Sequence, residues 1–347
     1  MGDTSLAPTR LPITWLAIGF MGLVAAATVS MSVGAAGLSI NGIVVELLDG
    51  LPGIEMDSGL SATDSSILWQ IRLPRIVLGL LVGGMLALAG TSYQGIFRNP
   101  LADPYLLGVA AGAGLGATLA IVYGPQSGST IAIVGPAAFA GALVAALGSY
   151  LLGTVGRATT TSLILAGVAV AAFLTSIQTY VQLRNTDSLR DVFSWMLGRL
   201  STAGWSEVRS ILPLVVVSSV ALLLHRRLLD VLALGDDEAT ALGVRVTTVR
   251  LVVLVAASLG TAAVVAVSGL IGFVGIIVPH ALRLVIGTSY ARLVPLSFLA
   301  GASFLVIGDL LGRTLISPAE LPIGVVTAFF GAPFFLGILH LTERAAT

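Results

Sequence analysis

The sequence contains no cysteine and no lysine, and charged residues make up only 10% of its 347 residues. Without cysteine the chain forms neither disulfides nor thiolate metal sites. A soluble domain carries about 25% charged residues, so this chain has too little charge to cover a water-facing surface. Because 56% of its residues are hydrophobic and its mean hydropathy is +1.02, lipid must solvate much of that surface.

The absence of lysine also limits the chemistry of the chain. All 17 basic residues are arginine, and they balance 17 acidic residues to a net charge of zero. A phosphate loop of the Walker A type needs its lysine, so the chain is not itself a standard P-loop ATPase, and zero net charge argues against nucleic-acid binding. No pair of the three histidines has ligand spacing, and no catalytic set is recognisable. We therefore expect neither a metal site nor a cofactor nor enzymatic activity in this chain.

Ten apolar segments are long enough, or nearly so, to cross the hydrocarbon core, which takes about 20 helical residues. They predict an all-α, polytopic membrane protein with a single transmembrane domain over residues 1–347. The closely spaced seventh and eighth segments leave one long broken helix open as an alternative. The ten segments are 11–33, 76–97, 104–122, 130–153, 158–181, 207–225, 251–268, 270–286, 293–311 and 321–341.

An even number of spans places both termini on the same side of the membrane. With the N-terminus inside, ten arginines fall on the inner side and seven on the outer side. Arginine favours the cytoplasmic side, so we expect a multi-pass protein of the cell membrane with both termini cytoplasmic. The 41 glycines, many of them inside the spans, favour close packing of helices, because small residues let transmembrane helices approach one another.

Residues 225–250 form the largest predicted internal loop. Acids at 236–238 suit the first turn of a short helix, where they complement the helix dipole, and Gly243 lies where a C-terminal cap belongs. Ala239 and Leu242 are three residues apart and would share a small apolar face. Such a helix at a membrane surface suits a groove on another protein, although a plain connecting helix remains an equal alternative from spacing alone.

Three arginines are predicted at the outer surface. Arg72 and Arg75 are three residues apart before the second span and share a face if the helix begins there. Arg313 follows the ninth span on the same side. An exposed pair of guanidinium groups suits bidentate pairing with carboxylates of a partner. Interfacial anchoring, or an internal ion pair between Arg313 and Asp309, is the alternative.

Four hydroxyl residues, Thr159 to Ser162, open the fifth span on the inner side. Their position predicts a helix N-cap, in which a hydroxyl accepts a backbone N–H bond.

An ordered set of short motifs between Trp69 and Leu339 resembles the permeases of the iron-chelate and vitamin B12 importers. Each motif is weak alone, and the resemblance depends on their order. The chain departs from the family at Gly198-Arg199-Leu200, where Gly-Ser-Leu is frequent. The principal motifs are Arg-Leu-Pro-Arg from residue 72, Arg-Asn-Pro-Leu-Ala-Asp-Pro from residue 98, Gly-Phe-Val-Gly-Ile-Ile-Val-Pro-His from residue 272 and Glu-Leu-Pro-Ile-Gly from residue 320.

The resemblance implies a vitamin B12 permease-like fold and a set of partners. Two copies of the permease, or the permease and a close paralogue, would form a pore. A separate ABC ATPase would bind ATP and Mg²⁺ and dock on the inner loop, and an extracytoplasmic binding protein would deliver the substrate. The residues that it implies are Arg72, Arg75 and Arg313 for binding-protein docking, Asp236, Asp237, Glu238, Ala239, Leu242 and Gly243 for ATPase coupling, and Thr160 and Thr161 for a cytoplasmic gate.

The resemblance thus predicts the permease subunit of an ATP-driven importer for a ferric siderophore, haem or vitamin B12. The alternative is an ion-gradient-driven secondary transporter of a small molecule. That alternative predicts several acids along the path, because intramembrane acids mark proton and ion relays. Asp309 is the only acid well inside a predicted span, which favours the ATP-driven importer.

Overall fold

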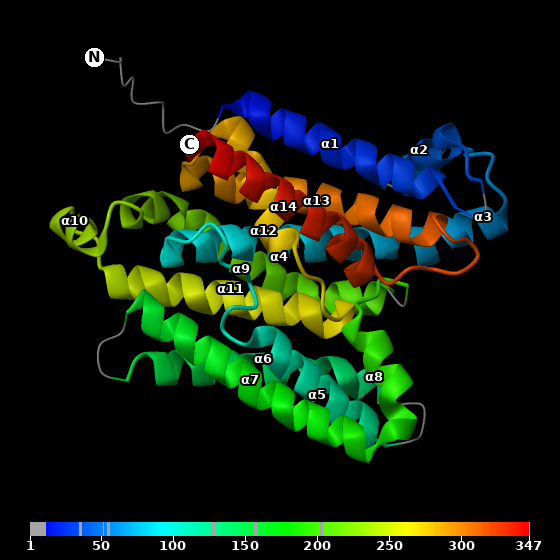
Figure 1. Ribbon diagram of the computed structural model, residues 1–347. Coiled ribbons are helices and arrows are strands. Elements are labelled where there is room, and N and C mark those ends of the chain that lie inside the picture. The colour runs from blue at the N-terminus through cyan, green and yellow to red at the C-terminus, as the bar shows by residue number, and fades with distance from the viewer. Residues whose placement is uncertain are drawn as a thin grey trace.

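The computed structural model describes residues 12–34, 37–50, 52–53, 56–125, 130–155, 159–201 and 204–346. Within these ranges the chain is all-α, with fourteen α-helices, one π-helical turn, one 3₁₀ turn and no strand. The long helices run roughly side by side between two ends of the molecule (Figure 1). This arrangement confirms the all-α membrane fold expected from composition.

Ten helices correspond to the ten predicted spans. In the described residues, seven helices are long and apolar enough to cross a membrane, and α5, α12 and α14 contribute shorter apolar stretches. The ten helices are α1 (Ile13–Ser32), α4 (Leu73–Phe97), α5 (Val109–Tyr123), α6 (Thr130–Gly153), α7 (Thr160–Arg184), α9 (Trp205–Leu232), α11 (Val246–Ser268), α12 (Val274–Ile286), α13 (Tyr290–Thr314) and α14 (Ile323–Ala346).

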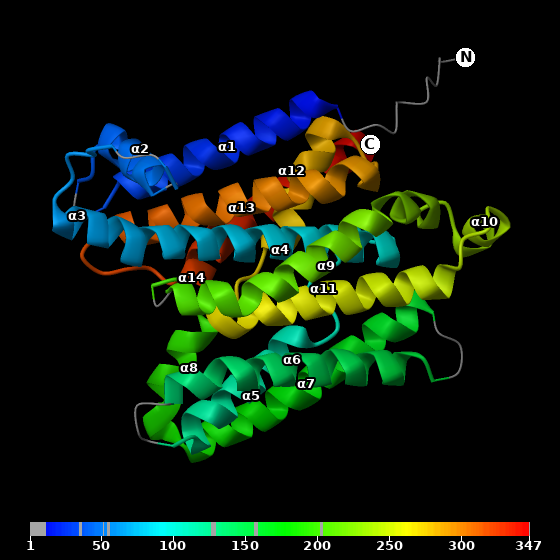
Figure 2. The same cartoon turned by 180° about the vertical axis from the view of Figure 1, so that it is seen from behind.

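Short elements distinguish the two ends of the bundle. One end carries α2 (Ile40–Asp49), α3 (Ala62–Ile67), the π turn η1 (Leu68–Arg72), the 3₁₀ turn η2 (Thr186–Ser188) and α8 (Leu189–Met196), and the opposite end carries α10 (Asp236–Ala241). Both views show α1 beginning and α14 finishing at the α10 end (Figures 1 and 2). The described chain therefore starts and finishes on one side, as an even number of spans requires.

Helix α4 lies in the middle of the bundle. Its side chains are almost all buried, as expected for a helix that is hydrophobic all round. Glycines let neighbouring helices approach its backbone: a Cβ on Gly90 would lie 2.1 Å from the carbonyl oxygen of Gly275 in α12, and a Cβ on Gly83 would lie 2.3 Å from that of Gly301 in α13. Helices α5, α6 and α7 form a separate layer beside α11 (Figure 2).

Two non-helical segments break the long apolar stretches. The first, 98–108, delays α5, so the predicted span 104–122 begins five residues too early. Asp103 and Pro104 belong to this segment, and Gly108 takes a left-handed conformation with φ +76°. The second segment, 269–273, separates α11 from α12, with φ +70° at Gly269 and +69° at Phe273. Ser289, just after α12, bonds to Asp230 of α9 at the α10 end, where α11 also begins. Helix α12 therefore runs back toward that end, and the alternative of one long broken helix is wrong.

The predicted inner loop 225–250 is shorter than expected. Helix α9 continues to Leu232 and α11 begins at Val246, so only residues 233–245 connect them. The apolar run ends before helix α9 does, because Arg226, Arg227 and Asp230 interrupt it. Charged residues continue a helix readily once it has left the hydrocarbon core. The residues between the two helices, 233–245, lie within the predicted loop 225–250.

Candidate functional site

The connection between α9 and α11 folds as its sequence predicts. Helix α10 begins at Asp236 with three acids in its first turn. Gly243 follows it with φ +83°, a conformation that costs glycine little. The amide of Val244 donates to the carbonyl of Ala239 at 3.0 Å, which closes the helix end. The result is a rigid turn of helix held beyond the end of the bundle.

The expectation that Ala239 and Leu242 share an exposed apolar face is wrong. Ala239 is fully buried and belongs to the main hydrophobic core, whereas Leu242 is 65% exposed. The small side chain of Ala239 lets α10 approach α9. Leu234, just before α10, is 63% exposed and supplies the second large apolar group at this end. Beside them lies an open hollow of about 380 Å³ lined by Thr240 and residues 243–247.

The three acids of α10 point in different directions. Asp237 and Glu238 are exposed. The carboxylate of Asp236 instead meets two arginines, with its Oδ1 3.1 Å from Arg98 Nη2 and its Oδ2 3.0 Å from Arg250 Nη2. Arg98 comes from the end of α4 and Arg250 from α11. Asp236 therefore ties α10 to two helices of the bundle.

At the opposite end, Arg75 is the centre of an ion-pair cluster. Its Nε and Nη2 each donate to the carboxylate of Asp309 at 2.9 Å, and its Nη1 and Nη2 donate to Glu320 at 2.9 Å. The ion pair between Asp309 and Arg313, which the sequence left as an alternative, is also present, with 3.9 Å between Arg313 Nε and Asp309 Oδ2. Asp309 thus has two arginine neighbours inside the bundle.

The other two predicted docking arginines, Arg72 and Arg313, bond to the end of α1. Arg72 Nη1 donates to the carbonyl of Met31, and Arg313 Nη1 donates to that of Val33 at 2.9 Å. Arg313 Nη2 also donates to Ser30 Oγ at 2.8 Å. A helix leaves its last carbonyls without intrahelical partners and carries partial negative charge there. These arginines therefore cap α1 from α13 and from the turn before α4, and Arg72 is only 6% exposed.

A small cavity adjoins the Arg75 ion-pair cluster. Its volume is about 180 Å³, and its lining includes Arg75, Arg199, Asp309 and Glu320. Glu320 lies in the connection between α13 and α14, and its side chain remains 41% exposed. The hydrogen bonds that it accepts from Arg75 hold the pKa of its carboxyl below the ordinary value of 4.5. Glu320 is therefore ionised at neutral pH, and it shares the Arg75 guanidinium with Asp309.

The hydroxyls before α7 divide into two groups. Thr159 accepts from the amide of Ser162 at 3.1 Å, and Ser162 Oγ accepts from the amide of Thr159 at 3.0 Å, which confirms the predicted N-cap. The two gate candidates fall inside the first turn, with Thr160 half-buried and Thr161 exposed. The start of α7 lies at the end of the bundle that carries α10 (Figure 1).

Sequence reasoning missed two polar links that hold the bundle. Asp230 of α9 accepts from Ser289 Oγ at 3.0 Å and from the amide of Ala291 at 3.0 Å, so it caps the start of α13. Tyr105 Oη donates to the carbonyl of Ile271 at 2.9 Å and accepts from its amide at 3.0 Å. In the sequence, Asp230 stands out as an isolated acid close to Arg226 and Arg227, whereas no local sequence pattern marks Tyr105 as a linking residue. Among the described residues, no three metal-ligating side chains come together.

The chain is similar to known permeases over most of its length. Residues 17–340 match the FecCD transport family. The cobalamin import system permease protein of Halobacterium salinarum is 43% identical over 291 residues, covering 83% of this chain and 77% of that protein. The hemin transport system permease protein of Yersinia pestis is 39% identical over 275 residues, covering 78% of this chain and 82% of that protein.

The fold comparison agrees with the sequence comparison. A solved chain from a transporter described as of the metal-chelate ABC type, in an inward-facing conformation, superposes with a TM-score of 0.82 at 30% identity. The superposition covers 95% of this chain and 99% of the solved one. The chain therefore belongs to the FecCD transport family and is a membrane-embedded permease of the ABC-importer class.

Proposed function

We propose that this chain is the permease subunit of an ATP-driven importer that takes up a ferric siderophore, haem or vitamin B12. One observation carries the proposal: a ten-helix bundle of the FecCD family presents α10 at one end and an arginine–carboxylate cluster at the other. The two ends suit two different partners, an ATPase inside and a binding protein outside. Relatives named for cobalamin and hemin support this range of substrates.

The α10 end is the proposed docking surface for the ATPase. Leu234 and Leu242 expose large apolar side chains there, next to the exposed acids Asp237 and Glu238. Apolar anchors on either side of a short rigid helix fit a groove on another protein. ATP and Mg²⁺ would be bound by that partner, and both termini of the permease would lie on the same cytoplasmic side of the cell membrane.

The outer cluster is the proposed docking surface for the binding protein. Arg75 and Arg313 already have partners within the chain, and Arg72 is buried. Carboxylates of a binding protein would therefore have to compete with Glu320, the most exposed member of the Arg75 cluster. Charge-assisted, bidentate pairing of arginine with carboxylate supplies the geometry for this exchange.

The translocation path is proposed to lie between two copies of the chain. Helix α7 exposes most of its side chains although it is apolar enough to cross a membrane. A helix of this kind faces lipid or another copy of the protein. Thr160 and Thr161 at its inner end would then form the cytoplasmic gate of the homodimer, or of a heterodimer with a close paralogue.

Reconstitution tests the proposed function directly. The permease is co-expressed with an ABC ATPase and a binding protein from the same genome, purified as a complex and placed in vesicles. The cognate binding protein is first screened for binding of ferric siderophore, haem and cobalamin, and uptake of the bound ligand is then measured with and without ATP. ATP-dependent uptake that requires the binding protein is expected. Uptake that needs an ion gradient but neither ATP nor the binding protein would refute the proposal.

A further inference from the structure

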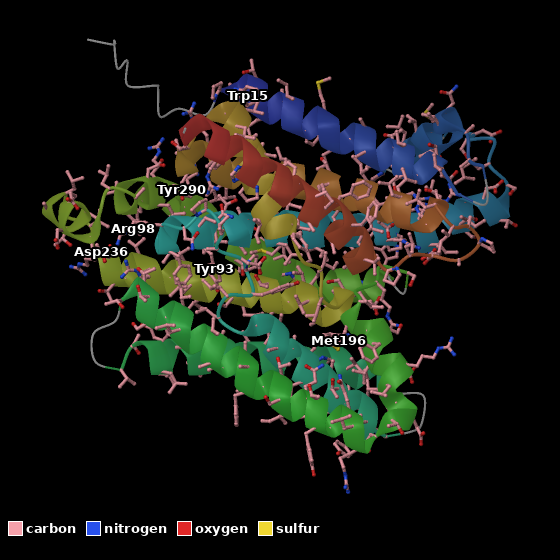
Figure 3. The ribbon with its side chains drawn as sticks, in the orientation of Figure 1. Trp15, Tyr93, Arg98, Met196, Asp236 and Tyr290 are labelled. Carbon is pink, nitrogen blue, oxygen red and sulfur yellow. The ribbon has the colours of Figure 1, made fainter. Side chains whose placement is uncertain are left out.

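The Arg-Asn-Pro motif at the end of α4 makes a long-range contact with α10. Arg98 is the residue that ends α4, and its side chain reaches the carboxylate of Asp236, with 3.1 Å between Nη2 and Oδ1 (Figure 3). Arg250 Nη2 donates to both oxygens of the same carboxylate, at 3.1 Å to Oδ1 and 3.0 Å to Oδ2. The Arg98 and Asp236 side chains are 40% and 43% exposed, whereas Arg250 is 12% exposed. Asp236 thus has one buried arginine partner, Arg250, and one more exposed arginine partner, Arg98.

Arg98 is also the first residue of the non-helical segment 98–108. It takes a left-handed conformation, with φ +49°, which non-glycine residues rarely adopt. The amide of Asn99 donates back to the carbonyl of Gln94 at 3.2 Å, so the turn closes tightly onto α4. A displacement of the Arg98 side chain therefore acts at the residue where α4 ends and the non-helical segment begins.

The segment 98–108 is joined to the second break in the helices. Tyr105 Oη exchanges two hydrogen bonds with the backbone of Ile271, at 2.9 and 3.0 Å. Gln94 Nε2 bridges the carbonyls of Ala102, at 3.3 Å, and Gly275, at 3.1 Å. The Tyr105–Ile271 bonds therefore join the two irregular segments, 98–108 and 269–273, and Gln94 of α4 links the first segment to the start of α12. Inside the bundle each such bond is costly to break.

We propose that Asp236 is a positioning residue that transmits movement of α10 through Arg98 to these two joined segments. This inference rests on the proposed function, because the movement of α10 would come from a docked ATPase. The contacts form one continuous path from α10 through the end of α4 to the breaks in the helices between α4 and α5 and between α11 and α12. The Arg250 contact instead anchors α10 to the bundle.

A spin label on Leu101 tests this path. The chain has no cysteine, so Leu101→Cys introduces a single attachment site, and Leu101 is 49% exposed within the segment. The complete permease–ATPase complex in lipid nanodiscs is compared without nucleotide and after trapping with ATP and vanadate. We expect trapping to change the mobility of the label. Arg98→Gln and Asp236→Asn should each make that change about two- to five-fold smaller, the range for one partly exposed ion pair.

Comparison of variants separates transmission from anchoring. The double variant Arg98→Gln with Asp236→Asn should behave like Asp236→Asn alone, because Asp236→Asn already removes the charge that pairs with Arg98. Arg250→Gln should weaken the response less than Arg98→Gln does, although the Arg250 contact is the more buried one. Arg227→Gln, which removes an exposed arginine of α9 at the same end, serves as the matched control.

The outcomes that would overturn the inference are distinct from failure of the proposed function. If the wild-type complex assembles and hydrolyses ATP but the label does not respond, or responds equally in Asp236→Asn, the path does not exist. If Arg250→Gln has the larger effect, Asp236 only anchors α10. If no ATPase assembles with the permease, the proposed function itself fails, and the inference fails with it.

Discussion

At the scale of single residues, the outer arginines show how a nearly uncharged bundle satisfies its few charges. Arg75 and Asp309 are 234 positions apart, yet they form a bidentate pair in which Asp309 is 6% exposed. A buried charge is tolerated only when it is paired and hydrogen-bonded. The pair therefore holds α4 to α13 as well as forming part of the proposed docking surface.

Removal of the Asp309 charge is predicted to destabilise the protein. In Asp309→Asn, Arg75 keeps Glu320 but loses its buried partner, which should lower the free energy of unfolding by about 3 kcal/mol. Thermal unfolding of the detergent-solubilised protein measures the change. Asp187→Asn, on an exposed residue that lies outside the ion pairs of the described chain, is the control. Equal midpoints for the two variants would contradict the structural role of Asp309.

The Arg75–Glu320 contact should depend on pH in a definite direction. The folded-state pKa of Glu320 lies below its ordinary value of 4.5 because Arg75 donates to it. A carboxyl with a lowered pKa contributes stability that is fully present above the unfolded value and is lost as pH falls through the folded value. The difference in unfolding midpoint between the wild type and Glu320→Gln should therefore be constant from pH 8 to about pH 5 and shrink at lower pH. A difference that grew on acidification would contradict this assignment.

At the scale of elements, close helix packing and helix capping both depend on neighbours from elsewhere in the chain. Arg72 and Arg313 cap α1, and Asp230 caps α13. Each cap comes from an element distant in sequence, so no local capping motif marks it.

The crossing of α4 and α12 gives a prediction at this scale. A Cβ on Gly90 would stand 2.1 Å from the Gly275 carbonyl oxygen, so Gly90→Ala forces the two helices apart. Overpacking of this kind costs about 1–3 kcal/mol, which thermal unfolding would detect as a lower midpoint. Gly148→Ala is the matched control, because nothing lies within 4 Å of the added Cβ in α6. If both variants unfold at the same temperature, the crossing is not close-packed.

At the scale of the whole molecule, the two ends of the bundle should lie on opposite sides of the membrane. Single cysteines replacing Leu242, next to α10, and Met56, next to α3, occupy exposed positions at opposite ends. In intact cells an impermeant maleimide should label Met56→Cys and leave Leu242→Cys unlabelled until the membrane is opened. Labelling of Leu242→Cys from outside would reverse the orientation and remove the proposed ATPase surface.

The number of spans, the shared side of the termini and the short helix at Asp236 could all be predicted from the sequence. Each depends on a local property: the apolar length of a segment, the parity of the crossings, or a run of acids followed by glycine. The same reasoning failed at Ala239, whose orientation depends on the packing of α10 against α9, and at residues 104–108, where apolar composition concealed a non-helical backbone.

What the sequence determined by itself was a lipid-solvated bundle of ten helices, because the lipid core demands long apolar segments whatever their neighbours are. The tertiary structure alone decided which polar groups meet. Arg75 pairs with Asp309, Arg98 with Asp236 and Tyr105 with Ile271. These partners lie far apart in the chain, and they meet only because a bundle with little water inside must bring its few polar groups together.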